Sequence, residues 1–212
     1  MSFDRLAPHY VRLERLIAGP LLQRARTAFL PALRDCRDVL VAGVGPGRFL
    51  PELRARNLRA HITCVDASAR MLEVAQQRVV NQRLDLARFR FVHARLPEVA
   101  LERGRYDAIA THFFLDCFSP DALAAVVDRL AEAATARSAW VISDFAVPPH
   151  GWQRQRARIV HGLMYAFFRV ATRLPARRLT APDRALAAQG FRLRARREFN
   201  HGLLRADWWE RV

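Results

Sequence analysis

Short apolar runs alternate with amphipathic segments through most of the chain. Runs of β-branched and small apolar residues predict buried strands over 38–45, 61–66, 88–94, 106–114 and 139–147. Between them, apolar positions spaced three to four residues apart predict helices over 48–57, 69–83 and 120–135. Strands that alternate with helices of this length predict an open, mostly parallel α/β sheet with helices on both faces.

Local signals sharpen the helix boundaries. The hydroxyl of Ser68 can cap the helix that begins at residue 69. Ser119 and Pro120 predict a second cap, with the proline at the first helical position. Pro51 is compatible with a helix only because it lies in the first turn.

The pattern differs at the two ends of the core. Residues 9–28 are amphipathic and divided by Pro20, which predicts a helical cap. A long amphipathic, arginine-rich segment at 151–174 predicts a helical lid after the fifth strand. A helix near 181–189 and strands over 191–199 and 202–210 complete a seven-stranded sheet with an antiparallel edge. We therefore expect one domain over 1–212, divided as cap 1–35, core 36–148, lid 149–180 and closing helix and strands 181–212.

Composition indicates a globular protein with a strongly basic surface. The net charge is +15, and all 35 basic residues are arginine, which indicates a compositional bias. The excess of basic over acidic residues fits a solvated, arginine-rich surface or, as the alternative, a surface that binds a polyanion. Three scattered cysteines form no disulfide framework, and the start carries no secretory signal. The longest apolar stretch, 159–171, is too short for a bilayer. These features predict a cytoplasmic location.

The loop after the first strand contains three glycines. Gly43, Gly45 and Gly47 give the spacing G-x-G-x-G, whereas a dinucleotide fingerprint needs a glycine where Arg48 stands. No G-K-[ST] follows, so the loop is not a Walker phosphate loop. Asp66 ends the second strand, where its two oxygens could accept hydrogen bonds from a vicinal diol.

This pattern resembles the class I S-adenosylmethionine-dependent methyltransferases. The segments "FDRLAPHYVRLERL" and "DASARMLEVA" are similar to those of small-molecule members, including the quinone-biosynthesis C-methyltransferases. The resemblance implies a Rossmann-like sheet and S-adenosylmethionine as cofactor. It assigns cofactor binding to Tyr10, Gly43, Gly45, Gly47, Asp66, Ala67, Met71, Ala94 and Arg95.

Two positions depart from the family pattern. Ala42 stands where the family usually has an acid that holds the cofactor's ammonium group. Ala94 and Arg95 stand where an acid often meets the adenine amino group. Both departures predict weaker cofactor binding and leave open a non-catalytic interaction protein.

The resemblance places the methyl acceptor at the end of the fourth strand, where His112 and Asp116 are the candidate catalytic residues. Because the methyl group is already activated, positioning can supply much of the rate, and a base is needed only for an acceptor that carries a proton. In the alternative interpretation, His112 is a core residue and Asp116 a helix-start residue. Aromatic residues predict an apolar or aromatic acceptor, bound by Phe113, Phe114, Trp152 and Tyr165. In the alternative interpretation most of these side chains only pack the lid. The His and Cys spacing predicts no metal site.

Three functions remain open from the sequence. A methyltransferase for a small molecule is the first hypothesis, and the lid could also rest on an anionic membrane, with the protein peripheral to it. An RNA or DNA methyltransferase is the second, supported by the charge but not by any N-P-P-Y or Pro-Cys motif. A methyltransferase-like interaction protein is the third. The sequence does not separate O-, N- and C-methylation.

Overall fold

One mixed sheet forms the centre of the molecule. The computed structural model describes residues 19–172 and 179–212, and in these residues seven strands have the order β3-β2-β1-β4-β5-β7-β6. The strands are β1 (Asp38–Ala42), β2 (His61–Asp66), β3 (Phe89–His93), β4 (Tyr106–His112), β5 (Ala134–Phe145), β6 (Phe191–Phe199) and β7 (Leu204–Arg211). The expected Rossmann-like, mostly parallel sheet is confirmed.

The strand pairing brings the ends of the central strands together. β1 pairs in parallel with β2 on one side and with β4 on the other. β7 runs antiparallel between β5 and β6, which leaves β6 at the sheet edge. The carboxyl ends of β1, β2, β4 and β5 therefore share one edge, where open α/β sheets bind ligands.

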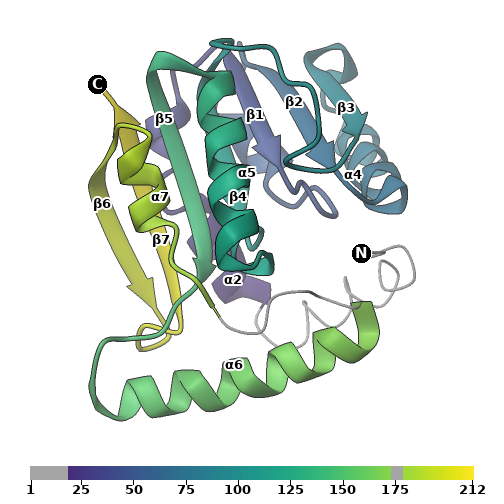
Figure 1. Cartoon of the computed structure of the whole chain (residues 1–212). Helices are drawn as coiled ribbons and strands as arrows, with labels where there is room; N and C mark the ends of the chain where they lie inside the picture. Colours follow the sequence, from purple (N-terminus) through teal and green to yellow (C-terminus); the bar gives the residue numbers. More distant parts are fainter. Residues whose placement is uncertain (1–18, 173–178) are drawn as a thin grey trace.

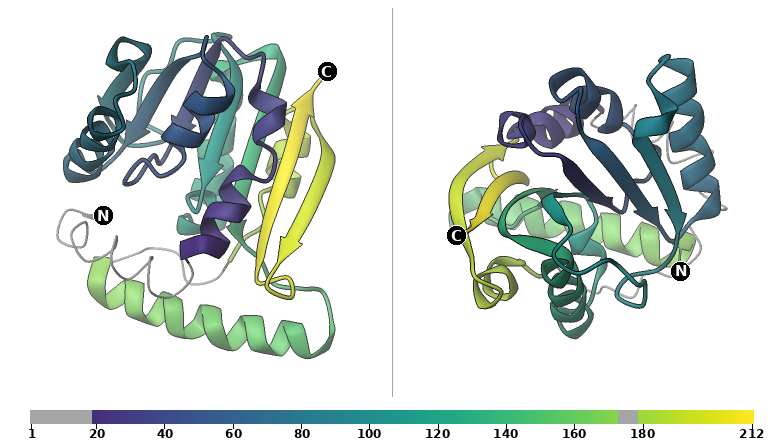
Figure 2. Two further views of the ribbon diagram at one scale, coloured as in Figure 1. Left: turned by 180° about the vertical axis from the view of Figure 1, so that it is seen from behind. Right: turned by 90° about the horizontal axis from the view of Figure 1, so that it is seen from above.

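Helices cover both faces of the sheet (Figures 1 and 2). One apolar cluster packs the first face, with residues of η1 (Leu30–Leu33), α3 (Leu50–Arg56) and α4 (Ala69–Asn81) against β1 and β2. A second cluster packs α5 (Pro120–Ala133) and α7 (Asp183–Ala188) on the other face. Helix α2 (Gly19–Thr27) contacts β5, β6 and β7. Short helices η2 (Leu86–Arg88) and η3 (Leu115–Cys117) precede β3 and follow β4.

The predicted helix starts agree with the structure except at one cap. The hydroxyl of Ser68 accepts from the Met71 backbone N–H at 3.1 Å, as expected for an N-cap. Ser119 is the N-cap residue of α5 as expected, but its side chain makes no capping hydrogen bond. Pro120 nevertheless lies in the first turn, where its fixed φ suits the helix and its missing N–H costs nothing.

Helix α6 (Gly151–Thr172) follows β5 and runs past the edge where the parallel strands end (Figure 1). Its first half is attached to the body, because Arg156 donates to the carbonyl of Asn200 at 3.1 Å and Ala157 and His161 are buried. Most of the expected N-terminal cap lies outside the described residues. Among the described helices, none has the length and apolar character needed to span a bilayer.

Candidate functional site

The glycine loop lies between β1 and α3 at the carboxyl edge of the sheet. Gly43, Gly45 and Gly47 have φ values of 68°, 53° and 70°, which disfavour side-chain-bearing residues. The Gly43 N–H donates to the carbonyl of Val65 at 2.9 Å, which ties the start of the loop to β2. The sequence therefore needs glycine here for the backbone path itself.

The three glycines face different surroundings. A Cβ added to Gly43 would lie 2.2 Å from the Phe114 ring, and one added to Gly47 would lie 2.9 Å from Ala75. A Cβ added to Gly45 would meet no described atom within 4 Å. Gly43 and Gly47 thus permit internal packing, whereas Gly45 is the position where a ligand can approach the backbone.

Asp66 is held beside this loop by backbone hydrogen bonds. Its Oδ2 accepts from the Gly45 N–H at 2.8 Å, and its Oδ1 accepts from the Ser68 N–H at 2.9 Å. Burial raises the pKa of Asp66, and these hydrogen bonds oppose the rise. A carboxylate has about four acceptor positions, so capacity remains for hydroxyl donors. Ala67 lies exposed next to it, and Met71 is buried in α4.

The end of β3 lies against Asp66. The Ala94 N–H donates to the Asp66 carbonyl at 3.0 Å, so Ala94 and the exposed Arg95 are at the expected edge of the site. His93 is paired with Asp66 in the sheet register, and its Nε2 lies 3.2 Å from the Ala67 carbonyl. Because a carbonyl only accepts, Nε2 of His93 carries the proton. Nothing in the sequence distinguishes His93 except its place at the end of a strand.

His112 has a tautomer fixed by its neighbours. The Ser143 hydroxyl donates its proton to the Ala25 carbonyl at 2.8 Å, so its oxygen must accept from Nδ1 of His112, 3.1 Å away. Nε2 of His112 therefore carries a lone pair, is inaccessible to solvent and has no hydrogen-bond partner among the described residues. Burial, together with the Arg26 charge, lowers the pKa of His112 to about 3. The ring is neutral at physiological pH.

Asp116 lies in η3 and is accompanied by a second buried acid. Burial raises the pKa of Asp116 to about 6, and burial together with the Asp116 charge raises the pKa of Asp144 well above its ordinary value. Asp144 is the last residue but one of β5, and its Oδ1 accepts from the Phe114 N–H at 3.1 Å. The sequence analysis missed Asp144, because nothing local distinguishes it from a strand-end acid.

The aromatic residues predicted to bind the acceptor are only partly assembled. The Arg26 guanidinium lies 4.9 Å above the Phe113 ring, and Phe114 packs on Gly43. Trp152 is 58% exposed, and its described ring contact is with His201 at 5.3 Å. Tyr10 and the side chain of Tyr165 lie outside the described part of the structure. Within the described ranges, no group of His, Cys, Asp or Glu could hold a metal ion.

A family model described as "Methyltransferase domain" matches residues 39–136. This segment contains the glycine loop, Asp66, His112 and Asp116. Residues 39–136 form a methyltransferase domain. The expected resemblance to class I methyltransferases is confirmed over this segment of the chain.

Solved structures share the fold of this methyltransferase domain and its C-terminal strands. Mitomycin 7-O-methyltransferase aligns with a TM-score of 0.74 and 14% identity, over 100% of this chain and 61% of that one. The Burkholderia thailandensis 1,6-didemethyltoxoflavin-N1-methyltransferase was solved with bound 1,6-didemethyltoxoflavin and S-adenosylhomocysteine. It aligns with a TM-score of 0.66 and 19% identity, over 98% of this chain and 87% of that one. Magnesium protoporphyrin IX methyltransferase from Synechocystis PCC 6803, with bound S-adenosylhomocysteine, aligns with a TM-score of 0.69 and 19% identity, over 99% of this chain and 94% of that one.

At these identities the likeness shows the fold. The chain spans less than two thirds of the length of mitomycin 7-O-methyltransferase. No curated protein matches the sequence.

Proposed function

We propose that this chain is an S-adenosylmethionine-dependent methyltransferase that acts on a small apolar or aromatic acceptor. The observation that carries the proposal is the pair formed by Gly45 and Asp66: an open glycine whose N–H donates to a carboxylate at 2.8 Å. When bound, S-adenosylmethionine supplies a methyl group already activated for transfer. Gly45 gives it close access to the backbone, and Asp66 offers acceptors to its ribose hydroxyls.

The cofactor fits these residues despite the departures at Ala42 and Ala94. Ala42 is fully buried, and its side chain packs with Leu40 and Val65 in the apolar cluster. A carboxylate there would be buried in that cluster, so the alanine is consistent with this core. Affinity therefore depends more heavily on Asp66 than it would in a site with a second acid.

The acceptor class is supported by the aromatic residues after β4 and by α6. Phe113 lies under the Arg26 guanidinium and 5.4 Å from the Phe145 ring, which in turn contacts His161 of α6 at 5.4 Å. Flat π-systems pack well against such rings. Mitomycin, didemethyltoxoflavin and protoporphyrin, the compounds named for the structural neighbours, all contain conjugated rings.

Proton removal, where the acceptor needs it, is better suited to Asp116 than to His112. A base works best with a pKa near the working pH, and the pKa of Asp116 is about 6 whereas that of His112 is about 3. The fixed lone pair of His112 at Nε2 is shut off from solvent, so it can accept a hydrogen bond from the acceptor only if binding opens the contacts around the ring. Both residues should therefore affect turnover more than cofactor affinity. Replacing Asp116 with Asn and His112 with Gln, and measuring both quantities, tests this assignment.

Helix α6 could also bring the protein to an anionic membrane. Trp152 and Ile159 are 58% and 64% exposed, and they lie seven residues apart on one side of the helix. The segment 145–182 contains seven arginines and no Asp or Glu. An exposed apolar pair with adjacent arginines suits an anionic lipid surface. Sedimentation with anionic vesicles at low salt tests this contact, and binding to RNA or DNA of equal charge would favour the nucleic-acid alternative.

Calorimetric titration with S-adenosylhomocysteine tests the proposed function as a whole. The unmodified protein should bind it in a one-to-one complex. Absence of binding would support the methyltransferase-like interaction protein. The acceptor can then be sought by following transfer of an isotopically labelled methyl group to mixtures of aromatic compounds.

A further inference from the structure

The turn after β4 holds a bulky residue in an unusual backbone conformation. Phe113 has a φ of 54°, in the left-handed region that glycine and asparagine adopt most readily. Such a conformation costs free energy, and it persists only where the surrounding contacts hold it. Strained residues gather at functional sites, and this one lies at the carboxyl edge of the sheet, between β4 and η3. The contacts that hold Phe113 therefore indicate what the turn does.

Two hydrogen bonds from consecutive backbone N–H groups fix this turn against the end of β5. The Phe113 N–H donates to the Ser143 carbonyl at 2.6 Å, which continues the parallel pairing of β4 with β5. The Phe114 N–H donates to Oδ1 of Asp144 at 3.1 Å. Asp144 is 3% exposed, so water does not readily replace its carboxyl group as the anchor of the turn.

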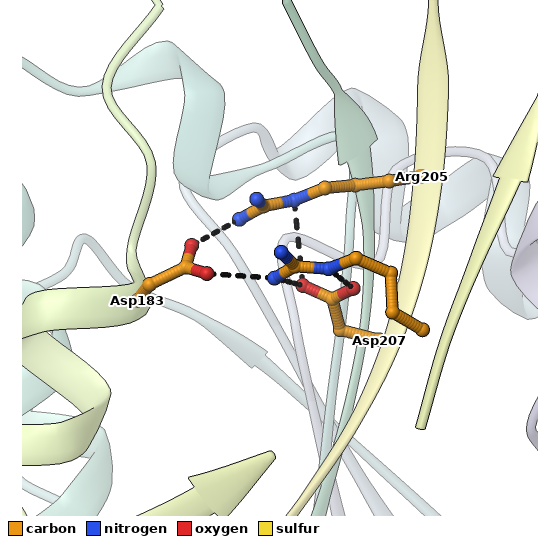
Figure 3. A network of polar contacts seen from close by, with 4 residues as sticks. Asp183, Arg205 and Asp207 are labelled. Carbon is orange, nitrogen blue, oxygen red and sulfur yellow. Dashed lines mark hydrogen bonds and ion pairs between the residues drawn. The ribbon is translucent and has the colours of Figure 1, made fainter. Parts of the chain in front are cut away.

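The ion pairs on the neighbouring strand do not require Asp144. Arg205 of β7 is paired with Asp144 in the sheet register. Arg205 nevertheless donates to Asp183 at 2.5 Å, and its Nε lies 3.3 Å from Asp207 (Figure 3). Arg196 bridges the same two carboxylates. Within the described ranges, the side-chain hydrogen bond of Asp144 goes instead to the turn, and its Oδ2 has no partner.

The two aromatic side chains of the turn contact different parts of the site. The Phe113 ring lies 5.4 Å from the Phe145 ring and 4.9 Å beneath the buried Arg26 guanidinium. Attraction between this cation and the ring offsets part of the strain at Phe113. The Phe114 ring lies against Gly43, since a Cβ added to that glycine would be 2.2 Å from the ring. The turn thus joins the end of β5 to the glycine loop.

Gly43 begins the loop that presents Gly45 to the proposed cofactor. The Gly43 N–H donates to the Val65 carbonyl at 2.9 Å, and the Gly45 N–H donates to Oδ2 of Asp66 at 2.8 Å. The Phe114 ring packs on the first of these glycines, so its position limits the paths that the loop can take. Both hydrogen bonds therefore depend on a turn that follows a different strand.

We propose that Asp144 is a positioning residue for the cofactor loop. Its carboxyl group holds the strained turn, and the turn holds the Phe114 ring against Gly43, which keeps the loop in the shape that binds the cofactor. The inference rests on the proposed function. A loop that adopts the binding shape in only a fraction of the molecules binds its ligand more weakly by that fraction. A change at Asp144 therefore reaches the cofactor site through Phe114.

Amide hydrogen exchange measured by NMR tests this link in the protein without ligand. Asp144→Ala removes the acceptor of the Phe114 N–H, and the loss of such a hydrogen bond changes an equilibrium by about two- to tenfold. The Gly43 and Gly45 amides should therefore exchange about fivefold faster than in the unmodified protein. The Val41 amide, inside β1, should exchange at an unchanged rate.

Calorimetric titration with S-adenosylhomocysteine measures the consequence for the site. Asp144→Ala should weaken binding by about fivefold. Asp144→Asn keeps an acceptor oxygen, so it should restore affinity and exchange rates to within about twofold of the unmodified protein. Asp207→Ala removes another fully buried acid and should lower the unfolding midpoint. It should not speed exchange in the loop relative to β1, so it separates positioning from a general loss of stability.

A double-mutant cycle tests the contact at the other end of the link. Phe114→Ala removes the ring and keeps Asp144, so it tests the same link if Asp144→Ala does not fold, and the loop amides should again exchange faster. The added methyl group of Gly43→Ala would clash with the ring, so Gly43→Ala and Phe114→Ala together should lose less stability than the sum of the single losses. Phe89→Ala, which removes a ring at the start of β3, should be additive with Gly43→Ala and is the control.

The outcomes distinguish the two proposals. Equal exchange of the loop amides in the unmodified protein and Asp144→Ala would overturn the positioning role, as would additive losses in the cycle or equal affinities of Asp144→Asn and Asp144→Ala. The methyltransferase proposal survives these results if the unmodified protein binds S-adenosylhomocysteine. Faster exchange in the loop, with no binding by the unmodified protein, would support the link from Asp144 to the loop and refute the proposed function.

Discussion

Replacement of Asp66 gives the most direct test of the cofactor site. Its two oxygens already accept from the Gly45 and Ser68 N–H groups at 2.8 and 2.9 Å, and the remaining positions should accept from the two ribose hydroxyls. Hydrogen bonds to a charged group contribute about 1.5–3 kcal/mol each, of which water recovers a part. Asp66→Ala should therefore weaken S-adenosylhomocysteine binding by about tenfold to several hundredfold.

The affinity of Asp66→Asn for S-adenosylhomocysteine should fall between that of the unmodified protein and that of Asp66→Ala. Its amide oxygen can keep one backbone hydrogen bond, whereas its NH2 group must face the other backbone N–H, which is also a donor. Thermal unfolding of each variant checks that the glycine loop still folds, and Asp121→Ala, an exposed acid, serves as the control. Equal calorimetric affinities of the unmodified protein and Asp66→Ala would show that the site assignment is wrong.

Three further changes have distinct expected outcomes. Asp116→Asn should stabilise the fold by about 2 kcal/mol at pH 7. Burial raises the pKa of Asp116 to about 6, so the unmodified protein loses stability as the pH rises from about 4 to 6, whereas the variant does not. Equal urea midpoints of the two proteins across this pH range would contradict the prediction. Gly43→Ala should lower the unfolding midpoint strongly, because the added methyl group would lie 2.2 Å from the Phe114 ring. Gly45→Ala should cost only about 1–2 kcal/mol of stability through backbone strain, but it should weaken the binding of S-adenosylhomocysteine at least tenfold. Similar losses of stability in the two variants would refute this distinction. Asp207→Ala should destabilise the protein by about 3 kcal/mol in denaturant titrations, because Asp207 is fully buried between two arginines. A loss of stability below about 0.5 kcal/mol, the size expected for a surface ion pair, would contradict this prediction.

The sequence by itself determined the features that depend on neighbouring residues. The strand over 61–66 and the helix that begins after Ser68 agree with β2 and α4, because apolar periodicity and capping act within a few residues. The glycine spacing and Asp66 indicated the methyltransferase domain in the same way. The glycine loop follows β1 and Asp66 ends β2, and the carboxyl ends of neighbouring parallel strands lie at the same edge of the sheet.

The tertiary structure decided which groups meet across long separations. Ser143 contacts Ala25 from 118 residues away, and only this contact fixes the tautomer of His112. The insertion of β7 between β5 and β6 likewise places Asp207 beside the Asp144 strand.

Side-chain surroundings were also beyond the sequence pattern. Gly43 and Gly45 are alike in the motif, but only the packing of Phe114 shows that one glycine serves the core and the other faces open space. Asp116 and Asp144 are 28 positions apart and have ordinary local contexts. Their raised pKa values arise from shared burial, which depends on how the whole chain packs and not on any short segment of it.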